Sequence, residues 1–182
     1  MLNGATKQEI RKLFDTSQPP ELGPGPRQGI KPGAELNKSL ERALDQSTGN
    51  GKSRELIKAL VLLWHDHLEA AHEIAQGIAD STGSFIHAIM HRREPDYGNS
   101  AYWFRRVGKH PSFDEIAIRA VKVLKGDAKL SQKVIPRGEW DPFAFVNACE
   151  IAAQNCVEHQ QLLRELQAIE FLALFDWICE CD

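Results

Sequence analysis

The sequence has no large excess of charge of either sign and no long apolar run. Its 22 basic and 25 acidic side chains give a net charge of −3. Proteins that bind nucleic acid in bulk need a basic face that displaces counterions, so this class of function is excluded. The most apolar segment, residues 169–178, carries Glu170 and Asp176 and is too short to span a bilayer. The first four residues lack a basic stretch followed by apolar residues, so we expect no signal peptide.

Cysteine is also scarce, and its four positions do not suggest a disulfide framework. Cys149 and Cys156 lie two turns apart on one face of a predicted helix, where they would be small buried side chains. Cys179 and Cys181 have the ligand type for a soft metal, but terminal segments are usually mobile, which argues against a site there. We therefore expect a protein of the reducing cytoplasm.

Alternating strand patterns are missing, whereas apolar residues recur at helical spacing along most of the chain. The length suits one well-buried domain, and we predict an all-α, single-domain helical bundle. One long helix is expected over residues 53–80, followed by a tight break at 81–84 and a second helix over 85–93. Residues 143–182 contain neither glycine nor proline, yet one straight helix of that length would rise about 60 Å. A break is therefore expected near residues 158–161.

Proline and glycine gather in one segment near the N-terminus. Residues 16–33 hold five of the nine prolines and four glycines, which excludes a helix or a central strand. Two readings stay open, a mobile linker or an extended arm laid across the domain. We divide the chain accordingly into an N-terminal helix with this arm, residues 1–34, and an all-α domain, residues 35–182.

Five of the seven histidines fall between His65 and His91. On the predicted long helix, His65, Glu69 and His72 are spaced four and three residues apart and share a face. On the next helix, His87 and His91 share a face. If the two helices fold back on each other at the break, His72 and His91 both lie about 12 to 15 Å from the turn and can face each other.

Converging imidazoles and carboxylates are the ligands that Zn²⁺, Fe²⁺ or Mn²⁺ would accept. We predict a mononuclear metal site whose histidine ligands come from both helices (His72, His87, His91 and His65). Glu69 or Glu94 would be a further ligand or a general base. No second Glu-x-x-His pair follows, which disfavours a dinuclear site. The alternative is that the histidines satisfy carbonyl and carboxylate groups in a core.

Two arginine doublets flank an aromatic helix next to these histidines. The planar guanidinium fork matches a carboxylate or a phosphate, so the doublets could clamp a small anionic substrate. The candidate substrate-binding residues are Arg92, Arg93, Arg105, Arg106 and Tyr102. The other reading, which we favour, is a set of ion pairs with neighbouring carboxylates that include Asp66.

The block from residue 64 to residue 111 has a distinctive sequence. Gly83–Glu94 (GSFIHAIMHRRE) and Tyr102–Pro111 (YWFRRVGKHP) resemble the signature of an uncharacterised family of bacterial and fungal proteins, a resemblance that implies no activity. The combination of a lone His72 with the His87/His91 pair is also similar to that in the DinB/YfiT-like metal-binding four-helix bundles. That resemblance implies a helical bundle in which these three histidines bind a metal.

Three hypotheses of function follow. The first is a metal-dependent enzyme that acts on a small anionic molecule. The second is a non-enzymatic module that binds the same kind of anion through the histidines and arginines. The third is a structural protein, in which the Pro/Gly-rich arm and the apolar C-terminal helix join the subunits of a homo-oligomer around a buried ion-pair network.

Overall fold

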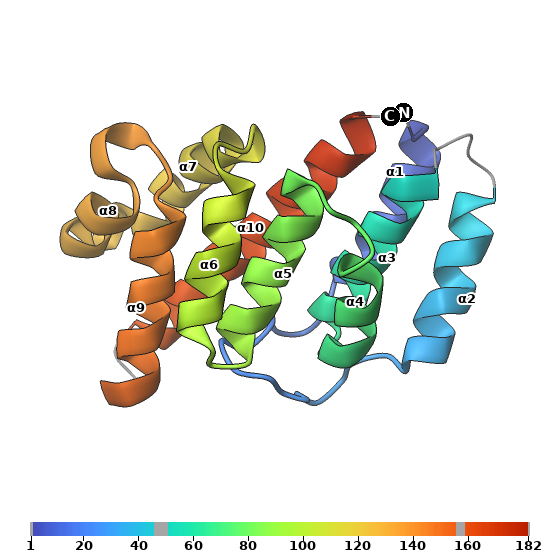
Figure 1. Cartoon of the computed structure of the whole chain (residues 1–182), viewed down its shortest axis with the longest axis horizontal. Coiled ribbons are helices and arrows are strands. Elements are labelled where there is room, and N and C mark those ends of the chain that lie inside the picture. Colours follow the sequence, from blue (N-terminus) through green and yellow to red (C-terminus); the bar gives the residue numbers. More distant parts are fainter. Residues whose placement is uncertain (1, 46–50, 156–158, 182) are drawn as a thin grey trace.

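The computed structural model describes residues 2–45, 51–155 and 159–181, and this part of the chain is all-α, without a strand. It confirms the predicted single-domain helical bundle (Figure 1). None of the described helices is long and apolar enough to cross a membrane. The helices are α1 (Gly4–Arg11), α2 (Gly33–Leu44), α3 (Gly51–Trp64), α4 (Leu68–Ala75), α5 (Ser81–Arg93), α6 (Tyr97–Val107), α7 (Ser112–Val123), α8 (Ala128–Val134), α9 (Pro142–Asn155) and α10 (Gln160–Glu180), with 3₁₀ turns at Lys12–Phe14, Leu124–Gly126 and Pro136–Gly138.

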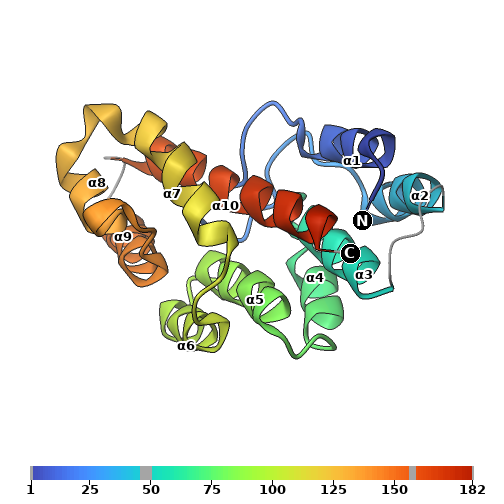
Figure 2. The ribbon, with the colours of Figure 1, turned by 90° about the horizontal axis from the view of Figure 1, so that it is seen from above.

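Helix α10 runs through the middle of the molecule, with α7 packed on one side and α3 on the other (Figure 2). Its apolar residues recur three and four positions apart, so they form a stripe that faces the core. Phe171 and Phe175 of this stripe are fully buried, and their rings pack against Trp64 and Phe14. The break predicted near residues 158–161 is confirmed at His159, whose backbone is left-handed with φ 72° immediately before α10 begins at Gln160. Cys156 lies outside the described residues.

The first helix, α1, lies near the C-terminal end of the last helix, α10 (Figure 1). The backbone N–H of Leu2 donates to the carbonyl of Cys179. Asp176 of α10 accepts a hydrogen bond from Arg11 at 2.8 Å and also forms an ion pair with Lys7 at 3.1 Å. Polar contacts therefore hold α1 to the C-terminal end of α10.

The prediction of one long helix over residues 53–80 is wrong. Helix α3 ends at Trp64, and the chain resumes as α4 only at Leu68. Asp66 between them adopts a left-handed conformation with φ 64°, which aspartate tolerates better than most side chains. Its carboxylate accepts hydrogen bonds from Arg27 and Arg93, both at 2.6 Å. These contacts fix the bend, which turns α4 away from the axis of α3.

The tight break predicted at residues 81–84 is also wrong, because these residues form the first turn of α5. The carboxylate of Asp80 accepts a hydrogen bond from the N–H of Gly83 at 2.8 Å and caps the helix. A Cβ atom on Gly83 would lie 2.2 Å from the carbonyl oxygen of Ile78, so the close approach of the preceding loop requires glycine. The turn between α4 and α5 therefore lies before residue 81.

The Pro/Gly-rich segment is an extended arm laid across the domain, along the lower edge in Figure 1. Arg93 donates from Nε to the carbonyls of Glu21 and Gly23. Gln167 donates from Nε2 to the carbonyls of Pro20 and Glu21, at 3.1 and 2.9 Å. Buried side chains from α5 and α10 thus satisfy the carbonyls of a segment that cannot form a helix, so the mobile-linker reading is wrong.

Candidate functional site

Three histidines meet where α4 packs against α5. His72 projects from α4, and His87 and His91 project from one face of α5, one turn apart. The ring centroid of His72 lies 5.2 Å from that of His87 and 5.9 Å from that of His91. The centroids of His87 and His91 are 6.3 Å apart. We refer to these three residues as the histidine cluster.

His87 is the most deeply buried member of the cluster, with 1% of its surface exposed. Its Nδ1 lies 3.3 Å from the carbonyl oxygen of Gly83, one turn earlier in α5. The tautomer that donates from Nδ1 to this carbonyl leaves the lone pair on Nε2. Within the described residues, Nε2 is buried without a hydrogen-bond partner. Burial, with smaller contributions from His72, His91 and Arg106, lowers the pKa of His87 to about 4. The ring is therefore neutral at pH 7.

The ring of His91 is oriented by one residue at the C-terminal end of α5 and one in the first turn of α6. Its Nδ1 lies 3.1 Å from Oε2 of Glu94, and its Nε2 lies 3.4 Å from the amide nitrogen of Asn99. A histidine that donates from one ring nitrogen to a carboxylate presents the other nitrogen as a lone-pair donor, which is the usual arrangement behind a metal ligand. Glu94 thus acts on His91 and not as a separate group facing a substrate.

Helix α6 covers the cluster with an aromatic ring. The indole of Trp103 stacks on His87, with centroids 4.1 Å apart and planes inclined by 9°. The guanidinium of Arg106 lies over the same indole, 5.3 Å from its centroid. Arg105 and Tyr102 are exposed on α6, and the ring of Tyr102 contacts the edge of Trp103. Of the candidate substrate-binding residues, Arg106 and Tyr102 are linked to the cluster, both through Trp103.

The expectation that His65 joins the metal site is wrong. The ring is fully buried, but its Nε2 lies 2.8 Å from the carbonyl oxygen of Leu13 and its Nδ1 accepts from the N–H of Lys31. Both nitrogens are therefore used to hold the N-terminal segments, because the bend after α3 separates His65 from the face of His72. Glu69 is exposed in the first turn of α4, and no contact joins it to the cluster within the described residues.

The favoured prediction of an ion pair with Asp66 is confirmed for Arg93. The alternative, in which Arg92 and Arg93 clamp a substrate, is wrong, since both are fully buried in ion pairs. Arg92 pairs with Glu170 of α10 and stacks on Phe145. Arg93 pairs with Asp66 at 2.6 Å. Successive residues of a helix point about 100° apart, so the arginines that follow His91 leave its face and enter the core.

The cluster as it stands is slightly too open for one ion. Three imidazoles bound at about 2.1 Å to a tetrahedral ion would have centroids about 5 Å apart, and only one of the three pairs is that close. The planes of His87 and His91 are inclined by only 21°. Accordingly, across residues 2–45, 51–155 and 159–181, no group of three or more histidine, cysteine or acidic residues is arranged to hold a metal ion.

Comparisons of the chain with protein-family models, with curated proteins and with solved structures found no match. The resemblance of the histidine–arginine block to a known family therefore stays a prediction, and the site is interpreted from its own geometry.

A second site was missed by sequence reasoning. A cavity of about 620 Å³ lies between α8 and α9, and no member of the histidine cluster lines it. Helix α8 has only seven residues, and no prediction was made for it. Because the cavity depends on how α8 folds back against α9, no local pattern indicates it.

Proposed function

We propose that the protein binds one divalent transition metal ion at the histidine cluster and uses it to act on a small anionic molecule. The observation that carries the proposal is Nε2 of His87, which is buried without a hydrogen-bond partner beside two other imidazoles. Leaving a buried polar atom unpaired costs about 1–3 kcal/mol. Coordination to a metal ion would satisfy the lone pair of this atom.

The donor set supports this proposal in two further respects. The Nδ1 atoms of His87 and His91 are engaged by Gly83 and Glu94, so each ring presents Nε2 as a metal donor. A metal ion would replace the amide of Asn99, which lies 3.4 Å from Nε2 of His91. His72 is half-buried, and within the described residues only ring contacts surround it. Its imidazole can therefore rotate and tighten the cluster toward an ion. Three histidine ligands would leave a fourth position open, as catalytic zinc sites do.

A bound ion would supply Lewis-acid polarisation of a substrate oxygen or a more acidic bound water. The chain's own residues would position the reactants. Glu94 would hold the ring of His91 in one orientation. Arg106, exposed beside Trp103, would attract the anionic group of the substrate to this side of the cluster.

The test is isothermal titration calorimetry of chelator-treated protein with Zn²⁺ and with Mn²⁺. We expect one equivalent to bind to the natural protein, with affinity at least tenfold weaker in His72→Ala and His87→Ala. His67→Gln is the matched control, because His67 lies outside the cluster and contacts the carbonyl of Lys31. Absence of binding, or equal affinity in His72→Ala and the control, would reject the proposal.

The second candidate is a module that binds the same anion without a metal. The 6.3 Å separation of His87 and His91 favours it, because the rings need not converge on one point. Titration with inorganic phosphate in the presence of a chelator separates the two candidates. Binding that persists under these conditions and weakens in Arg106→Met supports the module.

A further inference from the structure

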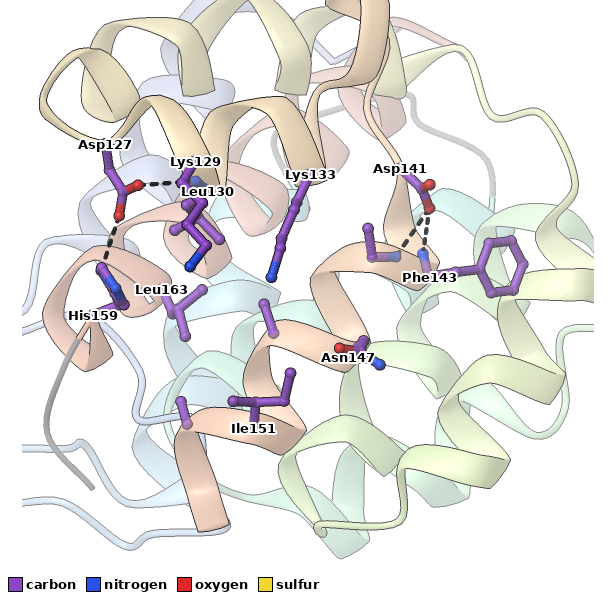
Figure 3. Close-up of a pocket in the computed structure, with 13 residues that line it drawn as sticks. Asp127, Lys129, Leu130, Lys133, Asp141, Phe143, Asn147, Ile151, His159 and Leu163 are labelled. Atoms are coloured by element: carbon purple, nitrogen blue, oxygen red, sulfur yellow. Dashed lines mark hydrogen bonds and ion pairs between the residues drawn. The ribbon is translucent and has the colours of Figure 1, made fainter. Parts of the chain in front are cut away.

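The cavity between α8 and α9 carries an inference that is independent of the histidine cluster (Figure 3). Its volume of about 620 Å³ is within the range of about 300–1,000 Å³ that is typical of small-molecule sites. Its walls come from α8, α9 and the first turns of α10, with the caps of α8 and α9 at the rim.

One part of the cavity wall is apolar and exposed. Phe143 and Ile151 of α9 are 42% and 46% exposed, and both line the cavity. Leu130 and Leu163 extend this wall from α8 and α10. An apolar ligand body would cover these side chains and remove their surface from water.

Another part of the wall is basic. Lys129 and Lys133 lie one turn apart on α8 and line the same cavity, and Lys133 extends into the opening in Figure 3. Neither lysine makes an ion pair within the described part of the chain. Two uncompensated ammonium groups beside an apolar wall favour a ligand with an anionic head.

The two carboxylates at the rim do not neutralise these lysines. Asp127 accepts a hydrogen bond from the N–H of Leu130, and its Oδ2 lies 2.9 Å from Nδ1 of His159, with which it forms an ion pair when that imidazole is protonated. Asp141 caps α9 by accepting from the N–H groups of Phe143 and Ala144. Both carboxylates are therefore engaged at helix ends.

We propose that this cavity binds a small amphipathic anion, namely a monocarboxylate with an apolar body. The carboxylate lies between Lys129 and Lys133, and the apolar body lies against Phe143 and Ile151. The amide of Asn147, which also lines the cavity, is available as a hydrogen-bond donor to the head group. A medium-chain fatty acid has this combination of charge and shape.

The probe is decanoate, titrated by calorimetry in the presence of a chelator so that the result does not depend on metal at the histidine cluster. Decanol tests the need for charge, acetate tests the need for an apolar body, and decyl phosphate tests whether the head must be a carboxylate. We expect saturable binding of one decanoate per chain, at least tenfold weaker binding of decanol, and no measurable binding of acetate. Decyl phosphate that binds more tightly than decanoate would overturn the carboxylate assignment.

Variants locate the binding in the cavity. Replacing both Lys129 and Lys133 by methionine keeps the apolar stems and removes the charge, and we expect decanoate affinity to fall at least tenfold. The matched control replaces Lys122 and Lys125, which are exposed and lie outside the cavity, by methionine. Ala148→Phe fills the space and should abolish binding. Decanoate that does not bind saturably, or that binds equally to both lysine double variants, overturns the proposal.

Discussion

Replacing Asp66 by asparagine tests the contacts that hold the bend between α3 and α4. The side chain of Asp66 has no exposed surface and pairs with both Arg27 and Arg93, whose side chains are 6% and 0% exposed. Asparagine keeps the size of the side chain and also tolerates the left-handed backbone at this position. The substitution therefore removes the charge with little change in shape and leaves two buried guanidinium groups without a counter-charge.

Breaking a buried ion pair by removing one partner costs about 3–5 kcal/mol, because the remaining charge stays in a poorly solvated environment. We expect Asp66→Asn to lower the free energy of unfolding by this amount. Urea denaturation followed by far-ultraviolet circular dichroism measures it, and the slope against urea should stay unchanged if only the native state is affected.

Asp45→Asn is the matched control for this experiment. Asp45 pairs with Arg54 at 2.9 Å, but its side chain is 73% exposed. Pairs in solvent contribute less than about 1 kcal/mol. If Asp66→Asn also costs less than about 1 kcal/mol, the two buried arginines do not depend on Asp66 and the account of the bend is wrong.

The remaining predictions concern the arm and the loop before α7. Gly25→Ala places a Cβ 2.9 Å from Cγ of Asp66 at a φ of 81°, whereas Gly29→Ala has a similar φ of 80° and its nearest neighbour at 3.9 Å. Thermal unfolding should show that Gly25→Ala loses more unfolding free energy than Gly29→Ala, in total about 1–3 kcal/mol. Equal losses in the two variants would mean that Asp66 moves to make room for the methyl group. Burial lowers the pKa of His110 to about 4, although the charge of Asp80 opposes this. The unfolded chain therefore binds the proton more tightly, and this histidine's stabilising contribution is lost as the pH falls from about 6.5 to about 4, by up to about 3 kcal/mol. The free energy of unfolding of His110→Gln should depend less on pH in this window, and an unchanged profile would contradict the assignment.

Local pattern was sufficient to predict much of the helical fold. The predicted helix over residues 85–93 lies within α5, because its helical spacing and the proline that follows it are both local signals. The bend after α3 could not be predicted in this way. It depends on Asp66 meeting Arg27 and Arg93, which lie 39 and 27 residues away in the sequence.

The same distinction applies to the candidate site. His87 and His91 share a helix, so their common face follows from their spacing alone. Whether a buried histidine faces a cavity or a carbonyl is decided by segments distant in the sequence. For His65 that segment is the N-terminal region, where Leu13 and Lys31 occupy both ring nitrogens. The roles of Arg92 and Arg93 were likewise set by partners on α10 and at the bend.

The packing of α1 against α10 has a consequence for biosynthesis. Helix α1 is made long before its partners Asp176 and Glu180, which lie 165 to 173 residues further along the chain. The ion pairs of α1 can form only after α10 has left the ribosome, whereas the arm can contact Asp66 and Arg93 as soon as α5 has emerged. Such large separations in sequence slow folding, because chain closure precedes the gain in contact energy. The ion pairs between α1 and α10 therefore form later in synthesis than the contacts that hold the arm to Asp66 and Arg93.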